Sequence, residues 1–262
     1  MLKPSVAVAI PAHNEGEAIE EFLAEIDTAL APVASKLTFV VVDDCSTDDT
    51  GTAARTAGES LTGEVIVIRN DVNLGHGPTV LEAYRRALDT GAELILQVDG
   101  DGQFLGSDLR RIAVLLEDGA AAVCGVRRFR YDPWFRMLMT RAVRHYVSLS
   151  FGVPTRDANC PLRGYRAALL GDLLPWLPDR ALVPNLYLTI LAARRGETMV
   201  EVDVNHRVRR GTSATGTMWS GVRRRAVLGR LIQFSTRALV ESVSFHRDIN
   251  SGRRPTTGAG GR

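Results

Sequence analysis

Apolar and polar residues alternate in blocks over the first half of the chain. Short continuous apolar runs are typical of buried strands, and runs with apolar residues at every third or fourth position are typical of helices. Strands are therefore predicted at residues 6–10, 37–42, 65–69, 94–98 and 120–125, with intervening helices at 17–30, 51–58, 80–90 and about 107–117. This order predicts an α/β fold, with a doubly wound, mostly parallel sheet that has helices on both faces.

The regular alternation fades after residue 126. The pattern there predicts a helix at 134–151, a polar loop at 157–166, helical segments near 167–174 and 184–195, and a strand at 198–204. Residues 251–262 are rich in Gly, Arg and Thr, a composition that predicts a disordered tail.

A basic amphipathic helix is predicted near the C-terminus. Between residues 218 and 245 the apolar residues fall near one helical face, and five arginines lie among or beside them: Arg223, Arg224, Arg225, Arg230 and Arg237. Such a helix can lie at a membrane interface, or it can pack on the protein's own core with a solvated basic face. Both interpretations have equal weight.

Charge is unevenly distributed along the 262 residues, although the net charge is only +2. Residues 1–126 hold 8 Lys and Arg against 21 Asp and Glu, residues 127–204 hold 12 against 7, and residues 205–262 hold 12 against 2. The basic C-terminal third could face nucleic acid, an anionic membrane or a phosphorylated substrate. The acidic first half disfavours a general nucleic-acid binder, so no nucleic-acid partner is expected.

Cysteine usage and hydropathy indicate the compartment. Three widely separated cysteines, Cys45, Cys124 and Cys160, indicate neither a disulfide framework nor a zinc site, and they suit a reducing environment. The N-terminal residues lack the pattern of a signal peptide, and no run of eighteen apolar residues is present. We expect a cytoplasmic protein, peripheral to the cytoplasmic face of a membrane.

Two aspartates follow the apolar run at residues 94–98, where the predicted strand ends. Ligands bind outside the carboxyl ends of strands in open α/β sheets, and alternation along an extended chain would bring Asp99, Asp101 and Gln103 to one side. Their oxygen atoms suit Mg²⁺ or Mn²⁺. An acidic Asp-Gly turn without a ligand is an equally weighted interpretation for an isolated Asp-x-Asp motif.

Three further polar segments follow predicted strands. Residues 11–16 and 43–50 carry carboxylates, and the glycine-containing residues 73–79 precede a helix, where free N–H groups could bind an anion. The glycine segment has neither the Gly-Lys-Ser/Thr ending of a P-loop nor the three-glycine dinucleotide fingerprint, which disfavours ATPase and dehydrogenase functions.

Together, four motifs resemble those of the family-2 glycosyltransferases of GT-A fold. They are Ala-Ile-Pro-Ala-His-Asn-Glu at residues 9–15, Val-Val-Asp-Asp-Cys-Ser-Thr-Asp at 41–48, Asn-Leu-Gly-His-Gly at 73–77 and Asp-Gly-Asp-Gly-Gln at 99–103. The second half most resembles the polyprenyl-phosphate branch, which includes the dolichyl-phosphate mannosyltransferases. The resemblance implies a catalytic domain at 1–215, followed by a basic amphipathic segment at 216–250.

The resemblance also implies roles for residues of the donor site. Asp99 and Gly100 would contact the nucleotide sugar, and Asp101 and Gln103 would hold Mg²⁺ or Mn²⁺ on the diphosphate. The residues that it places around the nucleotide are Pro11, His13, Glu15, Asp43 and Asp44.

For the acceptor side, the resemblance implies catalytic roles for Arg127 and for Arg141, which would meet the acceptor phosphate. Arg209 and Ser213 match a loop that closes over the diphosphate, but this chain lacks one residue of that loop and has Ala214 in place of its lysine. The candidates for the lost charge are Arg207 and Arg210. Asp157 and Arg163 are either a structural salt bridge or part of the site.

The function that follows is an inverting, metal-dependent glycosyltransferase. It would move a hexose from a GDP- or UDP-sugar to a polyprenyl phosphate, and because a phosphate acceptor is already ionised, a positioning arginine can replace a general base. A soluble acceptor and a non-catalytic nucleotide-sugar-binding or membrane scaffold are the alternatives. A membrane partner subunit is a further expectation if the acceptor is a lipid.

Overall fold

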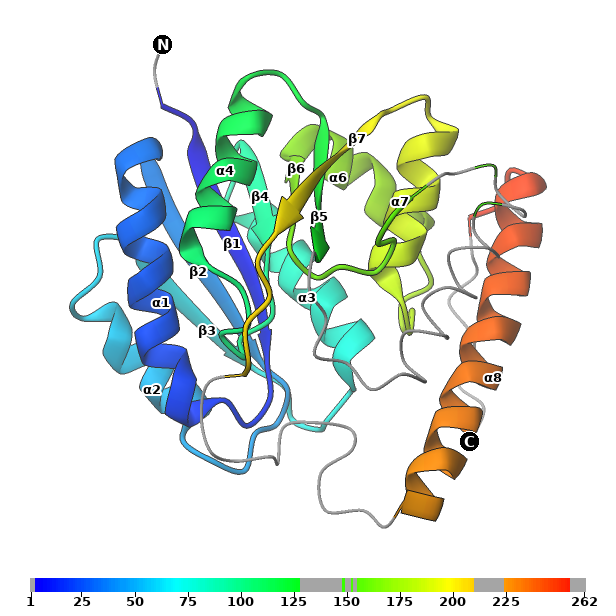
Figure 1. Cartoon of the computed structure of the whole chain (residues 1–262), viewed down its shortest axis with the longest axis horizontal. Helices are drawn as coiled ribbons and strands as arrows, with labels where there is room; N and C mark the ends of the chain where they lie inside the picture. The colour runs from blue at the N-terminus through cyan, green and yellow to red at the C-terminus, as the bar shows by residue number, and fades with distance from the viewer. Residues whose placement is uncertain (1–2, 128–147, 149–151, 153–154, 210–223, 255–262) are drawn as a thin grey trace.

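The structure is a computed structural model that describes residues 3–127, 148, 152, 155–209 and 224–254 (Figure 1). Its centre is a seven-stranded sheet in the order β3-β2-β1-β4-β6-β5-β7. The strands are β1 Ser5–Ala12, β2 Lys36–Asp43, β3 Glu64–Arg69, β4 Leu94–Gln97, β5 Ala122–Arg127, β6 Arg163–Arg166 and β7 Met199–Val204. All pairings are parallel except those that β6 makes with β4 and β5.

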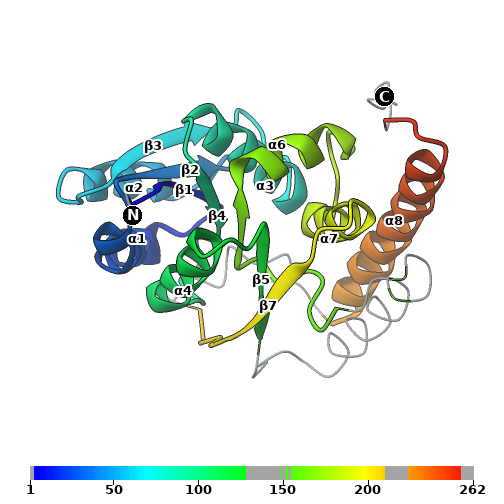
Figure 2. The same cartoon turned by 90° about the horizontal axis from the view of Figure 1, so that it is seen from above.

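Helices cover both faces of the sheet, as Figure 2 shows from above. The face with α1 Gly16–Leu30, α2 Thr50–Gly58 and α4 Gly106–Glu117 forms one core. The opposite core contains α3 His76–Asp89, α6 Ala167–Leu173, α7 Pro184–Arg194 and part of α8 Arg224–Asn250. Two short 3₁₀ helices, Ala31–Val33 and Leu174–Trp176, follow α1 and α6.

Alternation along the central strand assigns side chains to the two cores. Val6, Val8 and Ile10 of β1 face α1, whereas Ala7 and Ala9 face α3. Because every second side chain of a strand points to the same face, a continuous apolar run supplies both cores at once. The doubly wound α/β architecture predicted from the sequence is therefore confirmed.

The prediction of a polar loop at 157–166 is wrong at its end, because residues 163–166 form β6 between β4 and β5. Gly164 lies at the centre of this short strand, where an added Cβ would come 2.5 Å from Ile112 of α4. Glycine therefore lets α4 pack closely on β6. Arginines at both ends of the strand, Arg163 and Arg166, conceal it from a hydrophobicity pattern.

The C-terminal helix α8 packs partly on the core. Phe245 stacks on Tyr187 of α7 with ring centroids 4.2 Å apart, and Ile249 is also buried. Val240 and Val243 are 65% and 40% exposed, so this helix has both an inward face and an outward apolar face. Packing on the protein's own core is thus seen for Ser242, Phe245 and Ile249. Within the described residues, no helix is long and apolar enough to span a membrane.

Candidate active site at the carboxyl ends of the central strands

The loop after β1 is tied to the loop after β2 by backbone donors. The consecutive N–H groups of residues 14–16 donate to side-chain oxygens of Ser46, Thr50 and Asp48, at 3.0, 2.7 and 3.0 Å. A run of Ser, Thr and Asp after a strand suits this purpose because each side chain is a short acceptor. These bonds hold Glu15 at the start of α1, beside the ends of both strands.

Asp44 binds the glycine segment that follows β3. Its Oδ1 accepts the Leu74 N–H at 2.8 Å and the Asn70 amide at 2.9 Å, and its Oδ2 accepts the Gly75 N–H at 2.8 Å. Gly75 has a φ of 88°, a conformation that glycine adopts without strain. The segment was expected to offer its N–H groups to a bound anion, but two of them donate to a carboxylate of the chain itself.

Asp43 and His13 lie next to Asp44. The Asp43 side chain is fully buried, with Oδ2 2.6 Å from Arg69 Nη1 and Oδ1 accepting the Ser46 N–H at 2.8 Å. His13 Nδ1 lies 2.8 Å from the Asp44 carbonyl oxygen. The structure therefore brings the ends of β1 and β2 together as expected. Contact with a nucleotide stays a prediction for Pro11, His13, Asp43 and Asp44.

The acidic cluster, defined as Glu15, Asp99 and Asp101, faces Arg209. Arg209 Nη2 donates to Glu15 Oε1. Burial raises the pKa of Glu15 from its ordinary value of 4.5 to about 7, with Arg209 opposing the rise and the charges of Asp101 and Asp99 adding to it. Burial, followed by the charge of Asp99, raises the pKa of Asp101 to about 6. The three carboxylates therefore interact electrostatically.

The glycine between the two aspartates is required by packing. Gly100 donates its N–H to the Pro11 carbonyl at 3.1 Å, and an added Cβ would lie 3.2 Å from the Cβ of Ala12. The Asp-Gly-Asp turn thus lies directly against the end of β1. This contact explains why Asp99 and Asp101 are close to Glu15, although the three come from two loops.

Arg207 ties the segment after β7 to the aspartate loop. Its N–H donates to the Gln103 carbonyl at 2.9 Å, and the Gln103 side-chain amide donates back to the Arg207 carbonyl at 3.3 Å. The Arg207 guanidinium donates to Glu25 Oε2 at 2.7 Å and to the Gly102 carbonyl at 2.7 Å. The charge of Arg207, one of the two candidates for the lost loop lysine, is therefore paired with Glu25, while Arg209 reaches the acidic cluster.

The acidic cluster carries an excess of carboxylates, because Arg209 interacts with Glu15 and Asp101 and the pKa values of both carboxyls are raised. Within the described part of the chain, no group of three or more His, Cys, Asp or Glu side chains is arranged so that it could hold a metal ion by itself. Hard cations such as Mg²⁺ keep positions for water and substrate phosphates. Asp101 and the Gln103 Oε1 atom could hold such a cation together with a diphosphate.

Arg127, at the end of β5, is bound to Asp157. Its Nε and Nη2 atoms lie 2.8 and 3.1 Å from the two carboxylate oxygens, and the side chains are 16% and 3% exposed. Arg163 is fully buried and donates to the carbonyls of Ala158 and Cys160. Of the two alternatives for Asp157 and Arg163, the salt bridge between them is wrong, since Asp157 binds Arg127. A part in the site stays a prediction. A catalytic role for Arg127 stays a prediction.

The sequence analysis gave no role to Gln97, a buried side chain that contacts Asp99. Gln97 Nε2 donates to Asp99 Oδ1 at 3.1 Å, and Gln97 Oε1 accepts from Asn185 of α7 at 3.0 Å. His76 also approaches, with Nε2 3.9 Å from Asp99 Oδ1. The available signal was Gln97 itself, an uncharged polar residue in an apolar strand.

Some expected site residues cannot be placed. Arg141, Ser213 and Arg210 lie outside the described residues.

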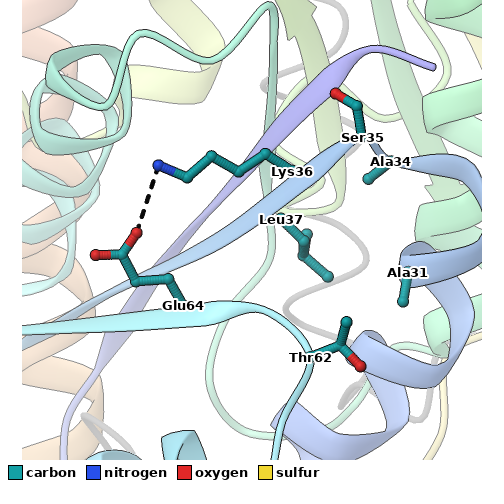
Figure 3. Close-up of a pocket in the computed structure, with 7 residues that line it drawn as sticks. All are labelled: Ala31, Ala34, Ser35, Lys36, Leu37, Thr62 and Glu64. Atoms are coloured by element: carbon teal, nitrogen blue, oxygen red, sulfur yellow. Dashed lines mark ion pairs between the residues drawn. The ribbon is translucent and has the colours of Figure 1, made fainter. Parts of the chain in front are cut away.

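A hollow of about 240 Å³ lies away from the candidate site, at the amino ends of β2 and β3, where Lys36 and Glu64 form an ion pair of 3.5 Å (Figure 3). It is at the opposite end of these strands from Asp43 and contains none of the predicted site residues.

The sequence was compared with known families. The family described as glycosyl transferase family 2 matches residues 7–172, which include both loops of the acidic cluster. The chain belongs to this family. The resemblance that the four motifs carry is thereby confirmed.

Curated relatives of this family-2 glycosyltransferase include two undecaprenyl-phosphate 4-deoxy-4-formamido-L-arabinose transferases. The one from Klebsiella pneumoniae (strain 342) is 28% identical over 201 residues, covering 77% of this chain and 59% of the relative. The one from Edwardsiella ictaluri (strain 93-146) is 25% identical over 214 residues, covering 81% and 63%. The chain thus spans about 60% of the length of these relatives.

Solved structures confirm the fold. Glucosyl-3-phosphoglycerate synthase from Mycobacterium tuberculosis, in complex with Mn²⁺, UDP and phosphoglyceric acid, aligns with a TM-score of 0.65 at 19% identity, covering 93% of this chain and 78% of that one. Its complex with UDP alone aligns with a TM-score of 0.63, also at 19% identity, covering 97% and 82%. The family-2 glycosyltransferase described here therefore has the GT-A fold.

Proposed function

We propose that this protein is an inverting, divalent-metal-dependent glycosyltransferase that moves a hexose from a nucleoside diphosphate sugar to a polyprenyl phosphate. The observation that carries the proposal is the acidic cluster at the ends of the central strands, where Glu15 and Asp101 share Arg209 and Asp99 adds a further negative charge beside them. Such an arrangement suits a donor whose diphosphate arrives with a cation. The curated relatives act on undecaprenyl phosphate, which supports the acceptor class.

Each residue then has a defined task. Asp99 orients the donor sugar, and Asp101 and Gln103 hold Mg²⁺ or Mn²⁺. When the donor binds, Arg209 leaves Glu15 and binds the diphosphate. The bound cation would neutralise charge that develops on the leaving diphosphate. Arg127 and Arg141 position the acceptor phosphate, which is already ionised at neutral pH and needs no base. Attack from the face opposite the diphosphate inverts the anomeric centre.

The donor is proposed to be a UDP- or GDP-sugar. Complexes of the structural neighbours with UDP support the first. Because the curated relatives transfer a substituted arabinose, donors of that class belong in the screen beside the hexoses.

A soluble phosphorylated acceptor is the second candidate. It is supported by the structural neighbours that bind phosphoglyceric acid, a small anionic molecule, in place of a lipid. The donor chemistry would be the same, and only the acceptor contacts would differ.

A matrix of donors and acceptors tests both candidates. The full chain is incubated with UDP- and GDP-sugars, with either undecaprenyl phosphate or 3-phosphoglycerate, and with Mn²⁺, Mg²⁺ or EDTA. We expect transfer to undecaprenyl phosphate that EDTA abolishes, with the product anomer opposite to that of the donor by NMR. Transfer to 3-phosphoglycerate alone supports the second candidate. Calorimetry that detects no metal-dependent nucleotide binding would favour a non-catalytic scaffold.

Arg141→Ala tests the acceptor side. We expect a raised acceptor KM or a lowered kcat with donor affinity nearly unchanged, because the proposed partner of Arg141 is the acceptor phosphate. An equal loss of donor binding would instead assign Arg141 to the nucleotide pocket.

We also propose that the protein is peripheral to the cytoplasmic face of an anionic membrane, through the basic amphipathic segment 216–250. On α8 the exposed Arg237, Val240 and Val243 support this. Each basic residue near an anionic surface contributes about 1 kcal/mol at most. Co-sedimentation with phosphatidylglycerol vesicles should weaken with salt and in Arg223/Arg224/Arg225→Glu. Equal binding to neutral vesicles, or none, would point to a soluble acceptor or a membrane partner subunit.

A further inference from the structure

Buried polar side chains connect helix α7 to Asp99 on the face of the sheet that α3 and α7 cover. Gln97 of β4 donates to Asp99 Oδ1 at 3.1 Å, Asn185 of α7 donates to Gln97 Oε1 at 3.0 Å, and Tyr84 of α3 donates to Asn185 Oδ1 at 3.0 Å. Tyr84, Gln97 and Asn185 are at most 3% exposed. Buried polar groups are costly unless they are hydrogen-bonded, so three of them in series call for an explanation.

The direction of every hydrogen bond follows from the carboxylate at the end of the chain. The Oδ1 atom of Asp99 accepts the hydrogen bond, so Gln97 presents its NH₂ group to Asp99. Its oxygen then faces Asn185, which must present its own NH₂ group and leave its oxygen to the Tyr84 hydroxyl. Burial raises the pKa of Tyr84 well above its usual range, so the phenol stays a donor.

We propose that Asn185 and Tyr84 are positioning residues for Asp99. They hold the Gln97 amide in the orientation in which its nitrogen donates to Oδ1, and this bond fixes the plane of the Asp99 carboxylate with Oδ2 directed to the donor sugar. The proposal rests on the proposed function for the role of Asp99. It assigns to α7, which lies 88 residues from Gln97 in sequence, a part in donor orientation.

Kinetics of the full-length protein test the consequence. Asn185→Leu and Gln97→Met should each lower kcat/KM for the donor about tenfold, the size expected for loss of a hydrogen bond to a charged group. The double variant should be no worse than either single variant, because both break the same connection. Tyr84→Phe should have a smaller effect of the same kind.

The matched control is Tyr187→Phe. It also removes a buried tyrosine hydroxyl, but that hydroxyl contacts Glu241 and Ser242 of α8. Its kcat and donor KM should equal those of the wild type. Multiplicative effects of Asn185→Leu and Gln97→Met, or kinetics of Tyr84→Phe that match those of Tyr187→Phe, would overturn the proposal.

A readout without turnover separates this proposal from the proposed function. The side-chain amide signals of Gln97 in a ¹⁵N spectrum are identified by their loss in Gln97→Met. They should exchange slowly with water in the wild type, and they should shift in Tyr84→Phe and Asp99→Asn but not in Tyr187→Phe. Unchanged signals in Tyr84→Phe would contradict the positioning role even in an active enzyme. Shifted signals in a protein that binds no nucleotide sugar would leave the hydrogen-bonded chain intact and reject the proposed function alone.

Discussion

Two clusters of arginine and carboxylate lie at the carboxyl ends of the strands, and they differ in charge balance. After β5, Arg127 binds both carboxylate oxygens of Asp157. After β1 and β4, Glu15 and Asp101 share Arg209, Asp99 adds a like charge, and the pKa values of Glu15 and Asp101 are raised. The bidentate pair joins the end of β5 to the loop that holds Asp157, whereas the excess of carboxylates in the acidic cluster leaves negative charge that a cation can neutralise.

The largest effect on activity is expected when one carboxylate of the acidic cluster is replaced. Asp101→Asn should lower turnover about a thousandfold, the range measured when a group that stabilises transition-state charge is lost. The variant should also lose Mn²⁺-dependent donor binding by calorimetry while its thermal midpoint is unchanged or raised, because a repelled carboxylate is neutralised. Asp118→Asn, on the exposed end of α4, is the control and should match the wild type. An active Asp101→Asn enzyme would contradict the metal assignment.

Breaking the bidentate pair should affect stability first. Asp157→Asn removes the charge of a nearly buried carboxylate that binds Arg127 through both oxygens, and breaking a largely buried pair costs about 3 kcal/mol of unfolding free energy. Urea denaturation measures the loss. The matched control is Asp172→Asn in the exposed pair with Arg195, where the expected cost is about 0.5 kcal/mol or less. Equal costs in the two variants would show that the Arg127 pair is not structural.

The smallest effect is a pH dependence of stability. The folded protein holds a proton on Glu15 up to about pH 7, whereas the unfolded chain releases it near pH 4.5. Over that interval the folded state binds more protons, so the free energy of unfolding should fall as the pH rises and level off above pH 7. Glu15→Gln should reduce the slope.

The effect of Mn²⁺ on thermal stability is a second test of the raised pKa values in the acidic cluster. A cation binds the deprotonated carboxylates, so it should raise the thermal midpoint more at pH 8 than at pH 5. No dependence of the Mn²⁺ effect on pH would contradict the raised pKa values of the acidic cluster.

Local patterns were sufficient to predict most of the fold. The apolar runs that form β1, β2, β3, β4 and β5 are continuous in sequence, so a local pattern is enough to locate them. The observed strand ends differ from the predicted ends by no more than two residues. The antiparallel β6 escaped because it has four residues, two of them arginines. Its place between β4 and β5 depends on pairing with distant strands.

Asp99 and Asp101 of the acidic cluster could be predicted as a site from the chain, because they lie in the loop just after β4, whereas Glu15 entered only through the family resemblance and was assigned to the nucleotide pocket. The residues that these side chains and Arg127 contact could not be predicted from the chain. Arg127 pairs with a residue 30 positions away, Asn185 reaches Gln97 across 88 positions, and Arg209 reaches Glu15 across 194. Spacing within a strand or helix predicts which face a side chain occupies, but a contact between distant segments exists only once the sheet and its helices have packed. Tertiary structure therefore decided which charges are neutralised and which are left for a ligand.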